Sequence, residues 1–176
     1  MKNQTNKNRL ICSIVFAGVL AAACFVIGNL PVEAAAGDCD KECRSALVTA
    51  KAATAKYHDI NNALADGFIS THQCVEVPQL GAMGIHYINI PRILNPNVDA
   101  AEPEVLLYIP DDGEMRLVAL EYVVPKFLTA SAPTLFGQEY EDDAIRNQYA
   151  LHVWAWRNNP SGTFADFNPK LGCAQQ

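Results

Sequence analysis

The sequence predicts an α+β domain in which a long N-terminal helix packs on a curved antiparallel sheet of about five strands. Two patterns lead to this class. Before Gly67, apolar residues recur at steps of three and four. After Gly67, the chain changes to short β-branched and aromatic runs separated by proline, glycine and asparagine. The segment 37–176 is long enough for one hydrophobic core and too short for two ordinary domains. We therefore expect a single α+β domain over residues 37–176.

Residues 1–36 have the features of a cleavable secretory signal peptide. Three basic residues among the first nine precede an apolar run over residues 10–30, and the small residues Ala34-Ala35-Ala36 follow. The run could also serve as an uncleaved membrane anchor, but the small residues favour cleavage. We expect an exported protein, periplasmic or extracellular, that keeps no membrane segment after cleavage.

The charge of the expected mature chain argues against nucleic-acid partners. Removal of residues 1–36 leaves ten basic and eighteen acidic side chains, a formal charge of −8. Polyanions such as nucleic acids and anionic membrane surfaces repel such a protein.

Four of the six cysteines lie outside the signal: Cys39, Cys43, Cys74 and Cys173. An even number in an exported chain predicts disulfide bonds, with three possible connectivities. Cys39 and Cys43 cannot be bridged inside a regular helix, because their Cβ atoms would be about 5 to 6 Å apart. A bond between them requires that the helix begin after Cys43 or that its first turn be distorted. A metal site at this pair is the less favoured alternative.

The segment from Arg44 to Asp66 is predicted to form the helix. Its apolar stripe consists of Leu47, Ala50, Thr54, Tyr57, Ile60 and Leu64. Gly67 occupies the position of a left-handed C-terminal cap.

Five strands are predicted after the helix, near residues 68–77, 84–90, 104–109, 116–124 and 149–156. The turn-forming residues 110–114 should join the third and fourth in a hairpin, and residues 95–103 and 125–148 should be long loops. Several strands are apolar on both faces. One face should pack on the helix, and the other should be covered by loops, by curling of the sheet around a pocket, or by a second subunit in a homodimer.

Three chemically versatile side chains interrupt apolar strands: His86, Glu121 and His152. Burial of such groups costs free energy unless they find partners. Two imidazoles and one carboxylate that converge would suit zinc, copper or ferrous iron, with open positions for water or substrate. They could also act without a metal, Glu121 orienting a histidine that serves as a general base.

A structural role for the same residues is the alternative. Histidines on strands often bond to backbone carbonyls, and Glu121 could pair with Arg116, Lys126 or Arg157. The spacing matches no compact ligand motif. Four aromatic residues could line the same cavity, although core packing is a competing explanation: Tyr87, Tyr122, Trp154 and Trp156.

Several motifs extend along the predicted domain: Gly81-Ala82-Met83-Gly84-Ile85-His86-Tyr87, Leu106-Leu107-Tyr108, Arg116-Leu117-Val118-Ala119-Leu120-Glu121-Tyr122, Leu135-Phe136-Gly137-Gln138, His152-Val153-Trp154-Ala155-Trp156 and Asn168-Pro169 before Cys173. In these motifs the chain resembles a family of small exported bacterial proteins of uncharacterised function. The resemblance implies that Cys74 and Cys173 form the family's disulfide, with Cys39 and Cys43 as a local addition. Family members often carry a further histidine where this chain has residues 147–150, and that difference weakens any metal site needing another imidazole there.

Three functions are consistent with these patterns. The favoured one is binding of a metal ion or small ligand by His86, Glu121 and His152. The second is a metal-dependent or acid–base enzyme acting on a small molecule. The third is a protein–protein interaction module that uses an apolar sheet face.

Overall fold

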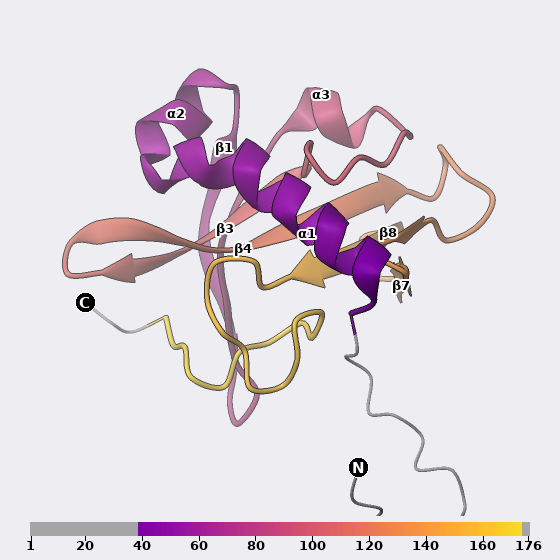
Figure 1. The fold of residues 1–176 in the computed structure, drawn as a ribbon. Helices are drawn as coiled ribbons and strands as arrows, with labels where there is room; N and C mark the ends of the chain where they lie inside the picture. The colour runs from indigo at the N-terminus through magenta and orange to yellow at the C-terminus, as the bar shows by residue number, and fades with distance from the viewer. Residues whose placement is uncertain (1–38, 174–176) are drawn as a thin grey trace, which may run out of the picture. The chain divides into compact units, whose positions relative to one another are not determined.

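A computed structural model of the protein describes residues 39–173. The predicted signal peptide, residues 1–36, lies outside the described residues. Within residues 39–173, no helix is both long and apolar enough to cross a membrane. The fold is α+β, with an N-terminal helix against a curled antiparallel sheet (Figure 1), as predicted.

Helix α1 (Lys41–Thr54) begins between the two cysteines that the sequence placed near its start. Asp40 is the N-cap, and its carboxylate accepts a hydrogen bond from the Cys43 backbone N–H at 2.8 Å. Cys39 therefore lies outside the helix, and its Cα is 5.2 Å from that of Cys43 in the disulfide. Neither predicted alternative was correct, because the helix begins neither after Cys43 nor with a distorted turn, but between the bonded residues.

The predicted single helix is divided into three parts. A 3-10 turn, η1 (Ala55–His58), continues α1, and α2 (Ile60–Ala65) starts anew with Asp59 as its N-cap. The break rotates the buried face, so that Ala63 is buried while Leu64 is half exposed. The prediction for Leu64 was therefore wrong. Gly67 has φ +88° and follows a Schellman-type end, with Phe68 N–H bonded to Ala63 C=O.

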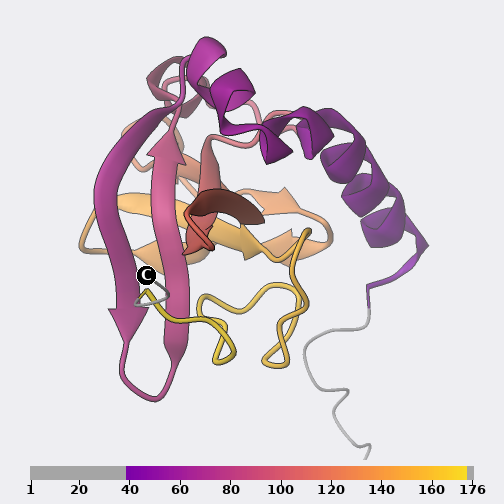
Figure 2. The ribbon, with the colours of Figure 1, turned by 90° about the vertical axis from the view of Figure 1, so that its left-hand side faces the viewer.

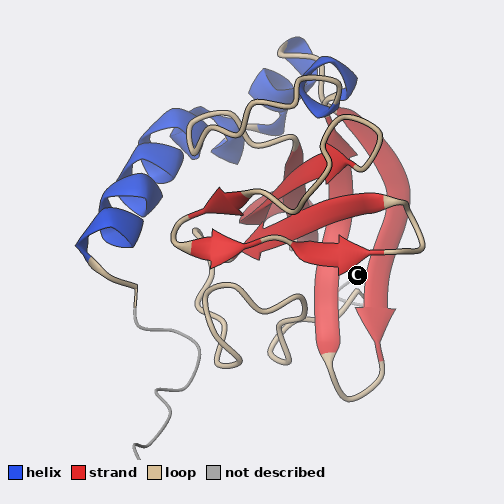
Figure 3. Cartoon of the chain, turned by 90° about the vertical axis from the view of Figure 1, so that its right-hand side faces the viewer, coloured by secondary structure: helices blue, strands red, loops and turns tan. Residues whose placement is uncertain are grey.

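The main sheet has six strands in the order β1-β2-β3-β4-β8-β7, and all neighbours are antiparallel. The strands are β1 (Ile69–Val77), β2 (Gly81–Ile88), β3 (Val105–Asp111), β4 (Glu114–Pro125), β7 (Glu141–Asp143) and β8 (Gln148–Val153). The sheet curls into a half-barrel, so that the hairpin β1–β2 crosses the direction of β4 and β8 (Figures 2 and 3).

All five predicted strands exist, with shifted ends, and the β3–β4 hairpin has the predicted turn. The strand predicted over residues 84–90 ends at Ile88, and a short helix α3 (Ile90–Ile93) follows, with Asn89 as its N-cap. The segment 125–148 is not one long loop. It contains β7 and a separate two-stranded sheet of β5 (Thr134–Leu135) and β6 (Gln138–Glu139). These strands are too short to carry an alternating pattern.

The two faces of the sheet are covered differently. Helix α1 and η1 lie over one face, where Tyr57, Tyr108 and Tyr122 are fully buried. Tyr108 Oη donates a hydrogen bond to Tyr57 C=O, and Tyr122 Oη to Ala100 C=O, each at 2.7 Å. These bonds satisfy hydroxyls that would otherwise be costly to bury.

The irregular C-terminal segment, residues 154–173, covers part of the other face (Figure 2). Its Asn168 forms a two-way backbone bridge with Ala82 on β2. A disulfide between Cys74 and Cys173, with Cα atoms 5.8 Å apart, closes the segment against β1. The apolar second face is thus covered by curling and by a loop, which were two of the three predicted possibilities.

Candidate metal centre

Strands β2, β4 and β8 bring His86, Glu121 and His152 to one face of the sheet, opposite the helix. Glu121 is directly paired with His152, and His86 reaches it diagonally across β3, where Leu107 lies opposite His86. Directly paired residues of antiparallel strands point to the same side, which explains why side chains distant in sequence converge. The three predicted ligands therefore do come together.

The side chains meet closely but form no direct hydrogen bonds with one another among the described residues. Oε2 of Glu121 is 3.6 Å from His86 Nε2, and Oε1 is 3.6 Å from His152 Nε2. One ligand atom from each of the three residues lies within 4.8 Å of the other two. All three side chains are largely buried, with exposed fractions of 13, 9 and 6 percent for His86, Glu121 and His152.

A fourth residue, Asp166, orients His152. Its Oδ1 lies 3.0 Å from His152 Nδ1, so the imidazole donates its Nδ1 proton to this carboxylate. In the neutral ring this tautomer leaves a lone pair on Nε2. That nitrogen is buried and has no hydrogen-bond partner within residues 39–173. A buried ring nitrogen without a hydrogen-bond partner, next to a carboxylate and a second imidazole, is an arrangement that a bound metal ion would satisfy.

The surroundings shift the pKa of the two imidazoles in opposite directions. Burial lowers the pKa of His86, against the opposing effect of Glu121. Burial alone would also lower the pKa of His152, but the negative charges of Glu121 and Asp166 outweigh it and raise that pKa above its usual range. Asp166 in turn has a lowered pKa because it accepts the hydrogen bond from His152. The lowered pKa favours the neutral form of His86, which is the form that binds metals, whereas the raised pKa of His152 favours its protonated form.

Two hollows meet at Glu121. The larger one, about 340 Å³, is bordered by His86 and Glu121 and by strands β1 to β4. The smaller one, about 200 Å³, is bordered by Glu121, His152 and Asp166, with Glu141 and Asp143 from β7. The cluster is therefore reachable by small molecules from two sides.

The four predicted pocket aromatics are not among the residues that border either hollow. Tyr87 and Tyr122 point to the helix-covered face, because each directly follows His86 or Glu121 along its strand. Trp156 also belongs to that core, and its Nε1 donates a hydrogen bond to Thr54 Oγ1 at 3.2 Å. Strand β8 ends at Val153, so Trp154 and Trp156 lie beyond the strand that was predicted to extend to residue 156.

Trp154 instead anchors the C-terminal segment. Its indole Nε1 donates to Ala165 C=O at 2.5 Å, and its backbone N–H donates to Thr163 C=O at 2.8 Å. The first of these bonds fixes Ala165, the residue that directly precedes Asp166. Sequence reasoning missed Asp166, Glu141 and Asp143, because two lie on a short edge strand and one in an irregular loop, where no periodicity indicates which way a side chain points.

The structural alternative for Glu121 is not supported by its neighbours. Arg116 pairs with Asp111 and Glu114 at the hairpin tip, and Lys126 pairs with Asp142. The acid instead lies between two imidazoles.

No family model, curated protein or solved structure matches this chain. The resemblance to a family of small exported bacterial proteins therefore stays a prediction.

Proposed function

We propose that this protein is an exported metal-binding domain that holds one divalent transition-metal ion, zinc, copper or ferrous iron, through His86, Glu121 and His152. The observation that carries the proposal is the buried, unpartnered Nε2 of His152, which faces a carboxylate shared with a second imidazole. The bound ion would supply the missing partner of that nitrogen.

The spacing supports a metal more than a hydrogen-bonded network. At 3.6 Å the imidazole–carboxylate contacts are too long for hydrogen bonds. Ligand atoms around a tetrahedral zinc ion at distances of about 2.0 to 2.1 Å are about 3.4 Å apart, which is close to that spacing. The contact from His152 to Asp166 matches the carboxylate–histidine–metal arrangement that fixes the ligating tautomer.

Export is part of the proposal and rests on two features. Residues 1–36 carry the pattern of a signal peptide. The two disulfides are consistent with an oxidising compartment.

An enzyme is the second candidate function. It is favoured by the hollow of about 340 Å³ that borders His86 and Glu121, because substrate could enter there and meet a metal or a base. The third candidate, interaction through an apolar sheet face, has less support, since helix α1 covers one face and residues 154–173 pack on part of the other.

The test is metal analysis of protein produced without a histidine tag. We expect one equivalent of zinc, copper or iron by mass spectrometry, or stoichiometric zinc uptake by the metal-free protein in titration calorimetry. His86→Ala and Glu121→Gln should each weaken zinc binding by about 100-fold or more, because a three-ligand site keeps only two protein ligands.

His72→Ala is the matched control, because His72 is an exposed histidine on β1 that does not border the cluster. It should bind zinc like the unchanged protein. Zinc binding that survives both Glu121→Gln and His86→Ala in variants that remain folded by circular dichroism would contradict the proposed site. Absence of stoichiometric metal binding at neutral pH would contradict the function itself.

A further inference from the structure

The larger hollow beside the candidate metal centre has an apolar wall. Five aliphatic side chains from β1, β2, α3, β3 and β4 form it: Val75, Ile88, Ile93, Val105 and Val123. Four of them, all but Val75, belong to a small apolar cluster separate from the two larger ones. Val105 and Val123 are almost fully buried, whereas Val75, Ile88 and Ile93 keep part of their apolar surface exposed, and covering that surface would be favourable. A short hydrocarbon chain has the chemistry to fill it.

One positively charged side chain also borders the hollow. Arg146, from the turn between β7 and β8, borders the hollow together with Gln148 and Gln73. Its guanidinium pairs with Asp143 at 3.0 Å but is 63 percent exposed and keeps further N–H donors. It also lies near enough to His86 that its charge adds to the effect of burial in lowering the pKa of that imidazole.

The charge of the hollow next to Glu121 depends on whether a metal ion is bound. Glu121 alone would repel an anion, and Asp143 offsets the charge of Arg146. A divalent ion would exceed the charge of Glu121, the one carboxylate among the described residues that border this hollow, since Asp143 and Asp166 border the smaller hollow instead. An anionic group is then attracted by both the metal centre and Arg146.

We propose that this hollow binds a short aliphatic carboxylate, with its hydrocarbon chain on the aliphatic wall and its carboxylate between the metal centre and Arg146. The inference rests on the proposed metal site, since the ion supplies the decisive positive charge. The volume of about 340 Å³ is at the small end of the range of ligand pockets, roughly 300 to 1,000 Å³, and suits a molecule of this size.

The experiment titrates sodium hexanoate into zinc-loaded and metal-free protein by calorimetry. We expect hexanoate to bind the zinc-loaded protein at least about tenfold more tightly than the metal-free protein. Acetate lacks the hydrocarbon chain and hexanol lacks the charge, so each should bind the zinc-loaded protein at least about tenfold more weakly than hexanoate.

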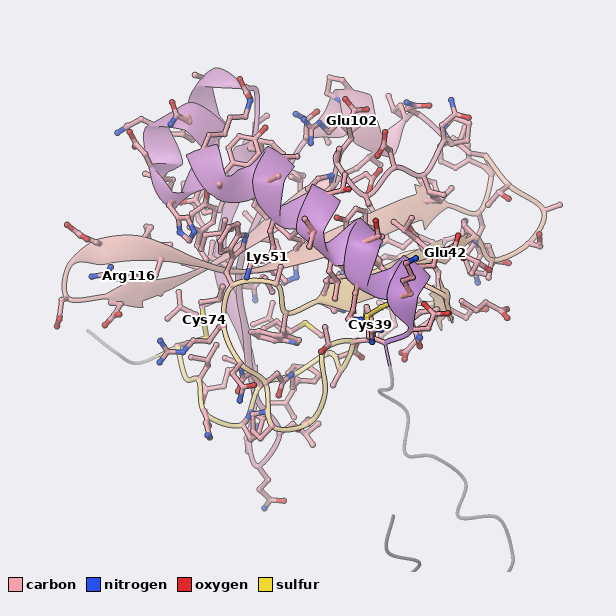
Figure 4. The ribbon with its side chains drawn as sticks, in the orientation of Figure 1. Cys39, Glu42, Lys51, Cys74, Glu102 and Arg116 are labelled. Carbon is pink, nitrogen blue, oxygen red and sulfur yellow. A yellow bond between two sulfur atoms is a disulfide. The ribbon has the colours of Figure 1, made fainter. Side chains whose placement is uncertain are left out.

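Two arginine variants locate the site. Arg146→Gln should weaken hexanoate binding by about tenfold while leaving zinc affinity within about twofold. Arg116→Gln is the matched control, because Arg116 lies at the tip of the β3–β4 hairpin and does not border the hollow (Figure 4). It should leave hexanoate affinity unchanged.

The outcomes separate the two proposals. If zinc binds but hexanoate does not, or binds equally with and without zinc, the ligand inference is overturned and the metal site stands. Equal effects of Arg146→Gln and Arg116→Gln would also overturn it. If zinc does not bind, the proposed function fails and the ligand inference fails with it.

Discussion

His152 is held between two carboxylates with different roles. Asp166 accepts the proton on Nδ1, whereas Glu121 faces the nitrogen left without a partner. Both negative charges favour the protonated ring, so protons compete with a metal for His152 more strongly than for an ordinary histidine. The affinity of the proposed site for a metal ion therefore depends on Asp166, which is not one of the three proposed ligands.

We expect Asp166→Asn to lower the pKa of His152 and also to weaken zinc binding by about tenfold or more at pH 8, because asparagine keeps a carbonyl acceptor but lacks the negative charge that makes the imidazole a more basic ligand. Imidazole resonances in nuclear magnetic resonance titrations measure the first effect, and calorimetry the second. Asp112→Asn in the exposed hairpin turn is the control. A variant with an unchanged His152 pKa would show that Asp166 does not act on this ring.

The pH dependence of stability provides a test of the same contacts in the metal-free protein. Because the pKa of His152 is higher in the folded than in the unfolded chain, its pairing stabilises the fold fully below the unfolded pKa, and this contribution is lost as the pH rises through the folded value. We expect Asp166→Asn to reduce the free energy of unfolding more at pH 5.5 than at pH 9, as measured by urea denaturation. An equal loss at both pH values would contradict the ion pair.

Glu104 is a second buried acid, and it is not part of the candidate metal centre. Burial raises its pKa to about 8, although the backbone N–H of Val123 donates a hydrogen bond to it at 3.1 Å. Between its usual pKa and about 8, the folded protein holds a proton that the unfolded chain has released. Stability should therefore fall as the pH rises through this window.

We expect Glu104→Gln to remove this fall, because glutamine keeps the carbonyl acceptor and has no charge to bury. The free energy of unfolding of the variant, relative to the unchanged protein, should increase by about 1 kcal/mol per pH unit between pH 5 and pH 8. A difference that does not change with pH would show that Glu104 is ionised in the fold.

At the scale of the elements, Gly84 allows β2 to approach β3 next to His86. Its φ is +110°, and a Cβ atom at this position would lie 2.6 Å from the backbone oxygen of Tyr108. A side chain there would strain the backbone and push apart the two strands that position His86.

We expect Gly84→Ala to destabilise the protein by about 3 kcal/mol or more and to weaken zinc binding. Gly113→Ala is the matched control, because Gly113 also has a positive φ, +78°, but no atom lies within 4 Å of its Cβ position. That variant should lose only about 1 kcal/mol and keep its zinc affinity. Thermal unfolding with and without zinc measures the stability and the zinc binding of each variant. Equal losses of stability in the two variants would contradict the steric argument.

Element types were predictable from sequence where the periodicity was long. The stripe of α1 and the runs of β3 and β4 cover several turns or alternations, and these elements have the predicted type and order. The break at Asp59 was missed because its capping role competes with an apolar stripe that continues through Ile60 and Leu64. Trp156 was placed wrongly because nothing in the sequence marks the end of β8 at Val153.

The candidate site could be predicted in part for a similar reason. His86, Glu121 and His152 stand out because each interrupts a buried apolar strand, and partners are required there. Their register, however, depends on which strands are neighbours and on the irregularity between Leu107 and Tyr108. The position of Asp166 depends on a loop that is fixed by Trp154, Asn168 and the disulfide between Cys74 and Cys173. No local sequence pattern encodes the position of that loop.

At the scale of the whole molecule, the bond between Cys74 and Cys173 joins the first strand to the C-terminal segment, across 99 positions. It constrains the unfolded chain far more than the bond between Cys39 and Cys43, which spans four positions and lies at the start of α1 (Figure 4).

We expect Cys74→Ser/Cys173→Ser to lower the free energy of unfolding by about 4 to 5 kcal/mol, and Cys39→Ser/Cys43→Ser by only about 2 kcal/mol. The first variant should also bind zinc more weakly, because the segment that carries Asp166 is no longer tied to β1. Denaturation and zinc calorimetry on both double variants check this. Equal zinc affinity in the two would show that the backbone bridge at Asn168 holds the segment by itself.

The order of the four cysteines along the chain has a consequence for biosynthesis. Among these four cysteines, each disulfide joins one cysteine to the next one along the chain. Cys39 and Cys43 have therefore both been synthesised before Cys74 leaves the ribosome. If the chain is exported as proposed, an oxidase that meets it N-terminus first can make both bonds in order, without an isomerase to correct them. Cys74 then remains without its partner until Cys173 has been delivered, and this second closure completes the support of the proposed metal ligands.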